Sequence, residues 1–237
     1  MDENGDIPGR SIVMANNVRP DTPANVSEMD KKAMYKLSYG LFVCTAVLDG
    51  KASGCIINTA VQVASDPNTI SIAVNKANYT HDMIMKAGNC NISVISCEAG
   101  FELFKRFGFQ SGRDVDKFAN YPLSSYRIAN NQIPYITDGT NAYFSLHVVK
   151  TVDLGSHTMF ICEPVMMEVL SSASSCTYEY YQNQIKPKPQ PVAKTSNGET
   201  VWRCTICGYE WVGEELPDDF ICPICKHPKD DFEKIMR

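Results

Sequence analysis

The chain has 237 residues, of which 44% are hydrophobic and 21% are charged, and its formal net charge is −5 at pH 7. This composition is that of an ordinary globular protein, and the negative charge gives no electrostatic reason to bind nucleic acid or an anionic membrane. No apolar run approaches the roughly 20 residues of a membrane-spanning helix, and the acidic first residues lack the basic and apolar segments of a signal peptide. We therefore expect a cytoplasmic protein.

The first 28 residues are polar and show no sustained periodicity, which favours a flexible N-terminal extension. Residues 29–181 then alternate between apolar segments of strand length and turn residues, among them the hairpin signal Asp49-Gly50. Strands are predicted at 42–48, 52–57, 69–74, 91–95, 142–149, 157–162 and 165–170. Helices are predicted only at 29–37, 81–86 and 101–107. Many strands and few helices favour a mainly β protein with a closed or partly closed β-barrel.

The composition changes after residue 181. Prolines alternate with other residues at Pro187, Pro189 and Pro191, and such a pattern favours an extended, semi-rigid spacer. We therefore predict a linker at 182–198 and a separate small domain at 199–237.

The ten cysteines divide into two groups. Six are scattered among apolar or small residues, which is typical of buried cysteines in the core of a reduced protein. The other four form two Cys-x-x-Cys pairs near the end of the chain: Cys204, Cys207, Cys222 and Cys225. Two facing pairs give the tetrahedral sulfur coordination that suits zinc or a single iron. A domain of about 39 residues is too small to be stable on its core alone, so metal ligation must stabilise it.

The residues around these cysteines favour iron. The run from Trp202 to Glu233 resembles rubredoxin, with the shorter spacing between cysteine pairs that is found in rubrerythrins. The resemblance implies one iron ion (Fe2+/Fe3+) bound by the four thiolates, and an aromatic core that shields it. That core would consist of Trp202, Tyr209, Trp211, Phe220 and Phe232. A structural zinc ribbon remains the alternative.

The larger domain carries a second resemblance. The segments 52–63, 66–74 and 155–163 are similar, in order and spacing, to the flavin reductase family of FMN-binding split barrels. This implies an FMN-binding split β-barrel over about residues 29–181. A barrel of this kind followed by a rubredoxin-like domain is similar to the high-molecular-weight rubredoxins of anaerobic bacteria, which implies a cytoplasmic homodimer.

Two lines of reasoning place the cofactor. A helix start offers free N–H groups and a positive dipole end to a phosphate, so Thr80 is predicted as N-cap, with Lys76 and Asn78 as further donors. The resemblance implies that the residues after the strand at 52–57 hold the flavin ring and that the loop at 107–118 covers its edge. The residues expected to bind FMN are Ser53, Asn58, Thr59, Ala60, Lys76, Asn78, Thr80, Phe109, Ser111 and Arg113. The resemblance also places His157 beside the flavin and nicotinamide positions, as the catalytic candidate.

We therefore expect a two-centre electron-transfer protein, in which FMN accepts two electrons and passes them singly to the iron. By resemblance, an NADH:rubredoxin oxidoreductase is the donor, and a flavodiiron protein that reduces oxygen or nitric oxide is the acceptor. An NAD(P)H-dependent flavin or ferric reductase that takes hydride directly is the alternative. The lack of a Gly-x-Gly-x-x-Gly fingerprint does not exclude it, because split-barrel reductases stack nicotinamide on the flavin. A third alternative is a binding module made of an FMN barrel and a zinc ribbon.

Overall fold

The computed structural model describes residues 31–187, 200–205, 208–222 and 228–236. The chain divides into two units, residues 1–37 and 38–237. In the first unit, the 3₁₀ helix η1 (Lys31–Lys36) confirms most of the helix predicted at 29–37. Residues 1–30, which include the predicted extension, lie outside the described residues. No helix in the described part of the chain is long and apolar enough to cross a membrane.

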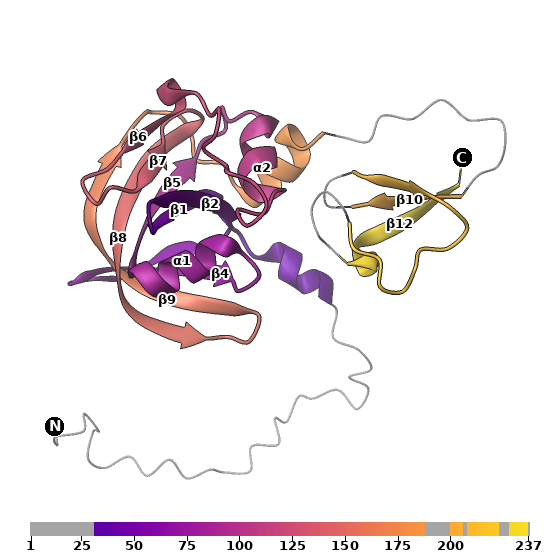
Figure 1. Ribbon diagram of the computed structural model, residues 1–237, viewed down its shortest axis with the longest axis horizontal. Coiled ribbons are helices and arrows are strands. Elements are labelled where there is room, and N and C mark those ends of the chain that lie inside the picture. The colour runs from indigo at the N-terminus through magenta and orange to yellow at the C-terminus, as the bar shows by residue number, and fades with distance from the viewer. Residues whose placement is uncertain (1–30, 188–199, 206–207, 223–227, 237) are drawn as a thin grey trace, which may run out of the picture. The chain divides into compact units, whose positions relative to one another are not determined.

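The larger domain is built on one antiparallel sheet of seven strands, in the order β2-β1-β5-β8-β9-β4-β3 (Figure 1). Its strands are β1 (Phe42–Leu48), β2 (Lys51–Ile57), β3 (Ala60–Ser65), β4 (Asn68–Asn75), β5 (Asn89–Ile95), β8 (Thr140–Asp153) and β9 (His157–Val169). Two short strands, β6 (Tyr126–Ile128) and β7 (Pro134–Ile136), pair separately. A mainly β fold with few helices is thereby confirmed.

A short connection between its two edge strands shows that the sheet curls into a barrel. Strands β2 and β3 are the two edges of the sheet, yet only Asn58 and Thr59 join them. Three steps along the chain reach about 11 Å at most, so the two edges must lie close together. The edges are not hydrogen-bonded to each other in the described sheet, and the barrel is therefore split between β2 and β3.

Most predicted strands are confirmed, with two differences. The segments 157–162 and 165–170 were predicted as separate strands, but β9 is continuous through Pro164. The register against β8 shifts at this point, with Ser145 opposite Met166 and Leu146 opposite Pro164. A bulge of this kind accommodates a proline without ending the strand. Strands β3, β6 and β7 were missed. Almost all side chains of β3 are exposed, which leaves no alternating burial pattern, and β6 and β7 have only three residues each.

The helices pack on opposite faces of the sheet. Strand β1 is buried on both faces, since Cys44 and Ala46 lie in one core cluster and Val43 lies in another. Helix α1 (Tyr79–Ala87) contributes Met83 and Ile84 to the first cluster. Helix α2 (Phe101–Gly108) contributes three apolar side chains to the second: Leu103, Phe104 and Phe107. Both helices confirm the predictions at 81–86 and 101–107. The hairpin at Asp49-Gly50 is also confirmed, with φ of 52° and 76°.

The scattered cysteines lie in or against these cores, as their pattern predicted. The first cluster contains Cys44, Cys55, Cys90 and Cys162. The second contains Cys176, and Cys97 packs against it. None of these six forms a disulfide.

The domain ends differently from the prediction. A short 3₁₀ helix, η2 (Leu123–Ser125), precedes β6. The barrel domain ends with the short helix α3 (Tyr178–Tyr180) and the π-helical turn η3 (Tyr181–Ile185). Residues 182–185 therefore belong to a helical turn rather than to an extended linker, because Tyr181 is buried in the second core cluster. The rest of the predicted linker, from residue 188, lies outside the described residues.

The tail is a small three-stranded sheet in the order β11-β10-β12. Its elements are β10 (Thr200–Cys204), β11 (Glu210–Val212), η4 (Lys229–Asp231) and β12 (Phe232–Met236). The five aromatic side chains predicted for its core gather in one cluster with Leu216. Phe220 packs edge-on against Trp211 and Phe232, with ring centroids 5.9 Å and 5.3 Å apart.

Candidate functional site

A cleft lies where the barrel is split. Its wall includes Asn58 in the β2–β3 connection, Asn75 at the end of β4, and the start of α1. The loop after α2 supplies Phe109, Ser111 and Gly112, and His157 enters from the start of β9. Segments far apart in the sequence meet here because the barrel curls, and the cleft combines polar side chains with exposed backbone.

Helix α1 presents its N-terminus to this cleft. The helix begins at Tyr79, and Asn78 is its N-cap with extended backbone (φ −73°, ψ 134°) and no capping hydrogen bond from its side chain. The prediction of Thr80 as N-cap was wrong: Thr80 is the second residue of the helix and is buried. The His81 amide donates to the Asn78 carbonyl at 3.1 Å, which leaves the Tyr79 and Thr80 amides without an intrahelical partner among the described residues. An uncapped helix start with two such amides beside a cleft suits a phosphate.

The loop of residues 109–117 lies directly against β2. A Cβ at Gly112 would lie 2.1 Å from Oγ of Ser53, so only glycine fits this approach. The Ser53 hydroxyl is buried and has no hydrogen-bond partner among the described residues. The Lys51 ammonium donates to the Gly112 carbonyl at 2.8 Å and lies over the Tyr79 ring, 4.8 Å from its centroid. A buried hydroxyl without a partner is costly, and a polar ligand would satisfy it.

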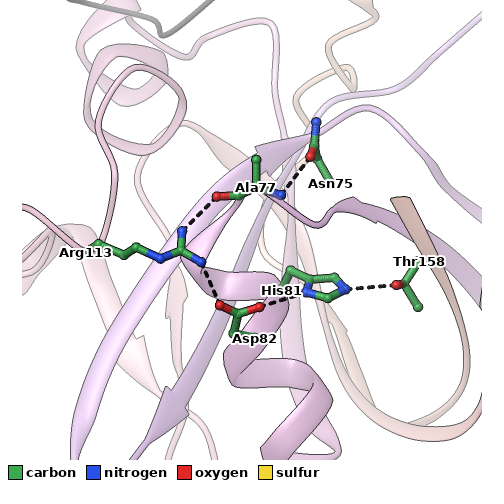
Figure 2. A network of polar contacts seen from close by, with 6 residues as sticks. All are labelled: Asn75, Ala77, His81, Asp82, Arg113 and Thr158. Carbon is green, nitrogen blue, oxygen red and sulfur yellow. Dashed lines mark hydrogen bonds and ion pairs between the residues drawn. The ribbon is translucent and has the colours of Figure 1, made fainter. Parts of the chain in front are cut away.

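A polar network ties three elements together at the cleft (Figure 2). The guanidinium of Arg113 donates to the Asp82 carboxylate at 2.6 Å and to the Ala77 carbonyl at 2.8 Å. Asp82 also contacts Nδ1 of His81 at 3.1 Å, and Nε2 of His81 lies 2.8 Å from the Thr158 hydroxyl. The hydrogen bond from His81 and the charge of Arg113 lower the pKa of Asp82. The network thus joins the loop, α1 and β9.

The structure brings part of the predicted set together. Six of the predicted residues line the cleft: Asn58, Asn78, Thr80, Phe109, Ser111 and His157. Ser53 is not among the lining residues, but its hydroxyl lies against Gly112, which lines the cleft.

The other four predicted residues do not line the cleft. Ala60 is the first residue of β3, and the Thr59 hydroxyl donates to the side chain of Asn58 at 3.1 Å. The Lys76 ammonium forms an ion pair with Asp153 at 2.6 Å, and Arg113 is engaged with Asp82. The two predicted cations therefore position protein groups in this structure.

His157 is half-buried at the first position of β9, and its Nδ1 lies 2.9 Å from the Ser156 hydroxyl. Sequence reasoning missed the cleft position of Tyr79 and Cys55. An aromatic residue in a first helical turn and a small apolar residue in a core strand carry no signal that distinguishes them from ordinary packing residues.

The tail holds the other candidate centre. Cys204 and Cys222 are buried in its aromatic cluster, while Cys207 and Cys225 lie outside the described residues. The turn after Cys204 is partly described: Gly208 has φ of 78°, its amide donates to the Cys204 carbonyl at 2.9 Å, and the Cys204 amide donates to the Tyr209 carbonyl at 2.8 Å. Two buried cysteines in an aromatic shell fit one half of a soft, four-thiolate donor set.

Comparison with known proteins matches both domains. Residues 34–188 match the flavin reductase like domain, and residues 202–233 match the rubrerythrin, rubredoxin-like domain. The chain is 36% identical over 233 residues to the high molecular weight rubredoxin of Moorella thermoacetica, covering 87% of this chain and all of that protein. It is 36% identical over 160 residues to the ferric-chelate reductase (NAD(P)H) of Archaeoglobus fulgidus, covering 68% of this chain and 93% of that protein.

Among solved structures, an FMN-binding protein from Thermus thermophilus shares the fold, with a TM-score of 0.54 and 17% sequence identity over 62% of this chain and 80% of that one. The fold and the two matched domains define the class: a flavin reductase-like barrel joined to a rubredoxin-like domain. Within that class, the chain belongs to the high molecular weight rubredoxin family.

Proposed function

We propose that this protein is a two-centre electron carrier, which binds FMN in the cleft of the barrel and one iron ion in the four cysteines of the tail. The observation that carries the proposal is the cleft itself, which lies at the uncapped start of α1. Gly112 in its wall packs against the Ser53 hydroxyl, which has no hydrogen-bond partner among the described residues. The same chain carries buried tail cysteines in an aromatic cluster. A flavin site and an iron–thiolate site in one chain suit electron transfer.

The residues present fit FMN. The Tyr79 and Thr80 amides at the start of α1 would hold its phosphate, and Ser53 and Asn58 would supply hydrogen bonds to its polar edges. Bound FMN would supply the ability to take up two electrons and to release them one at a time. The network of Asp82 with Arg113 and His81 would keep the loop, the helix start and β9 in place around it. His157 lines the cleft and would be able to hold or move a proton there.

The tail residues fit iron. Cys204, Cys207, Cys222 and Cys225 would be its ligands. An iron ion in four thiolates supplies one-electron chemistry. The aromatic side chains around Cys204 and Cys222 would exclude water from it.

The test is an anaerobic spectrum of the full-length protein, recorded before and during addition of NADH. We expect both flavin and ferric iron–thiolate bands, with slow or no bleaching until an NADH:rubredoxin oxidoreductase is added. Rapid bleaching of flavin and then iron by NADH alone would replace the carrier with a reductase. A spectrum without iron bands, together with zinc found by metal analysis, would favour the binding module instead.

A second candidate is an NAD(P)H-dependent flavin or ferric reductase. The 36% identity to a ferric-chelate reductase over the barrel supports it. Steady-state assays with NADH, NADPH and a ferric chelate separate the two candidates. A carrier reduces the chelate only when a separate reductase is present, whereas a reductase needs no other protein.

For partners, we propose a homodimer that receives electrons from an NADH:rubredoxin oxidoreductase and delivers them to a flavodiiron protein in the cytoplasm. Exposed apolar side chains on the edge strand β3 and on β9 support the dimer: Val61, Val63, Val165, Met166, Met167 and Val169. An exposed edge strand and an apolar surface favour association. Sedimentation analysis is expected to give twice the mass of the chain, and Val63→Glu is expected to produce a monomer. Reoxidation by a purified flavodiiron protein tests the acceptor.

A further inference from the structure

Lys117 is a buried lysine at the cleft that no described carboxylate neutralises. Its side chain is only 3% exposed, although it lines the cleft. No ion pair involves Lys117 in the part of the chain that the structure describes. A buried cation without a counter-charge is costly, so the fold maintains this group at a substantial free-energy cost.

Two carbonyls orient the ammonium. It donates to the Gly54 carbonyl of β2 at 2.7 Å and to the Phe107 carbonyl of α2 at 3.0 Å. An ammonium carries three hydrogens, so one donor is left beyond these two bonds. The backbone of Lys117 is also fixed, because the Arg106 guanidinium donates to the Lys117 carbonyl at 3.0 Å. Lys117 is therefore a fixed positive charge in the cleft wall.

The neighbours of Lys117 do not remove this charge. The titratable group that acts on Lys117 is the thiol of Cys55 on β2, and burial raises the pKa of that thiol, which keeps it neutral. The acidic residues closest in sequence, Asp114 and Asp116, are exposed. Since no described residue supplies a negative charge to Lys117, we look for that charge in a ligand bound in the cleft.

We propose that Lys117 pairs with the negative charge that the flavin ring gains on reduction, and so makes the cleft bind reduced flavin more tightly than oxidised flavin. This rests on the proposed function. Burial between two carbonyls gives Lys117 a fixed position, and a charge in a low-dielectric site acts strongly on a nearby anion. The helix start of α1 already provides for the phosphate, which leaves the ring as the group that changes charge.

The test compares the full-length protein with two variants. Lys117→Gln keeps two N–H donors for the two carbonyls but carries no charge, and Lys117→Arg keeps the charge. The affinities for oxidised and for reduced FMN are obtained from fluorescence titration and from redox titration of the bound flavin. The affinities for FMN and for riboflavin, which lacks the phosphate, are compared in the same way. Lys150→Gln, an exposed residue of β8, is the control for loss of one positive charge.

In Lys117→Gln, the ratio of the affinity for reduced FMN to the affinity for oxidised FMN is expected to fall at least tenfold. This corresponds to a fall of about 30 mV in the two-electron reduction potential of the bound flavin. Lys117→Arg and Lys150→Gln are expected to keep the wild-type ratio within threefold. The preference for FMN over riboflavin is expected to persist.

An unchanged ratio in Lys117→Gln would overturn the proposal, as would loss of the preference for FMN, which would make Lys117 a phosphate ligand. If both Lys117 variants fail to fold, the wild-type protein still decides, because equal affinity for oxidised and reduced FMN overturns the proposal. A wild-type protein that binds no flavin overturns both this proposal and the proposed function.

Discussion

The carboxylate of Asp82 lies 2.6 Å from the guanidinium of Arg113, in an ion pair between the first turn of α1 and the loop that borders the cleft. Both side chains are partly exposed, at 43% and 44%, so solvent screens their attraction. Arg113 also donates to the Ala77 carbonyl just before the helix, so two hydrogen bonds fix its guanidinium at the start of α1. The pair thereby sets where the loop lies relative to the helix start.

Asp82→Asn tests this relationship. The variant keeps the shape of the side chain but removes the charge, so Arg113 and the loop lose a strong partner. We expect the affinity for FMN to fall about fivefold, equivalent to about 1 kcal/mol, measured by quenching of flavin fluorescence. Asp153→Asn, which removes an exposed carboxylate that pairs with Lys76, is the matched control and is expected to change FMN affinity less than twofold. Equal losses in the two variants would show that net charge, rather than loop position, governs binding.

Gly112 and Ser53 form the second test, because an added Cβ at Gly112 meets the Ser53 hydroxyl oxygen at 2.1 Å. Gly112→Ala is expected to lower the free energy of unfolding by about 1–3 kcal/mol through overpacking. In Ser53→Ala/Gly112→Ala the clashing oxygen is gone, and at least half of that loss is expected to return. Chemical denaturation of the flavin-free protein measures both values. Gly100→Ala, where an added Cβ meets nothing within 4 Å, is expected to cost less than about 1 kcal/mol.

Ser53→Ala alone separates stability from binding. The hydroxyl is buried without a partner among the described residues, so its removal is expected to leave the flavin-free protein as stable as wild type or slightly more stable. Affinity for FMN is expected to fall three- to tenfold, because the ligand loses a hydrogen bond. Thermal unfolding with and without FMN reads both effects. A variant that loses stability without FMN, yet binds it normally, would show that Ser53 serves packing only.

The pH dependence of stability tests the burial of Lys117. Burial lowers the pKa of Lys117 from its ordinary 10.5 to about 8. Between these values the unfolded chain binds a proton that the native state does not, so the free energy of unfolding rises with pH. We expect flavin-free wild type to gain up to about 3 kcal/mol relative to Lys117→Gln between pH 7.5 and pH 10.5. A constant difference between the two proteins across this range would show that Lys117 keeps its ordinary pKa.

Removal of a tail cysteine tests the metal centre. Cys204→Ser is expected to remove the iron bands and most of the bound iron, because three thiolates hold the metal far less well than four. The barrel is expected to retain about one flavin per chain. Cys97→Ser, at a partly exposed cysteine of the barrel, is the control and is expected to keep both cofactors. Iron content that survives in Cys204→Ser, measured by elemental analysis, would contradict the four-cysteine site.

The amino-acid sequence by itself determined the features that depend on short-range patterns. Strand-length runs, the Asp49-Gly50 hairpin and the two main helices follow from local propensity and periodicity, and the structure confirms them. The four tail cysteines and their aromatic neighbours are likewise visible in one short stretch of sequence. The errors are local as well: β3 was missed because an exposed edge strand has no burial pattern, and the N-cap of α1 was placed at Thr80, two residues after the actual N-cap, Asn78.

Only the tertiary structure decided how the cleft is built. Lys117 reaches Gly54, 63 positions away in the sequence, Arg113 reaches Asp82 across 31 positions, and Gly112 lies against Ser53. None of these contacts leaves a local signature, because each depends on the curl of the sheet that brings β2, α1 and the 109–117 loop together. Whether a lysine is solvated or buried, and whether a serine has a partner, is therefore decided by packing between distant segments.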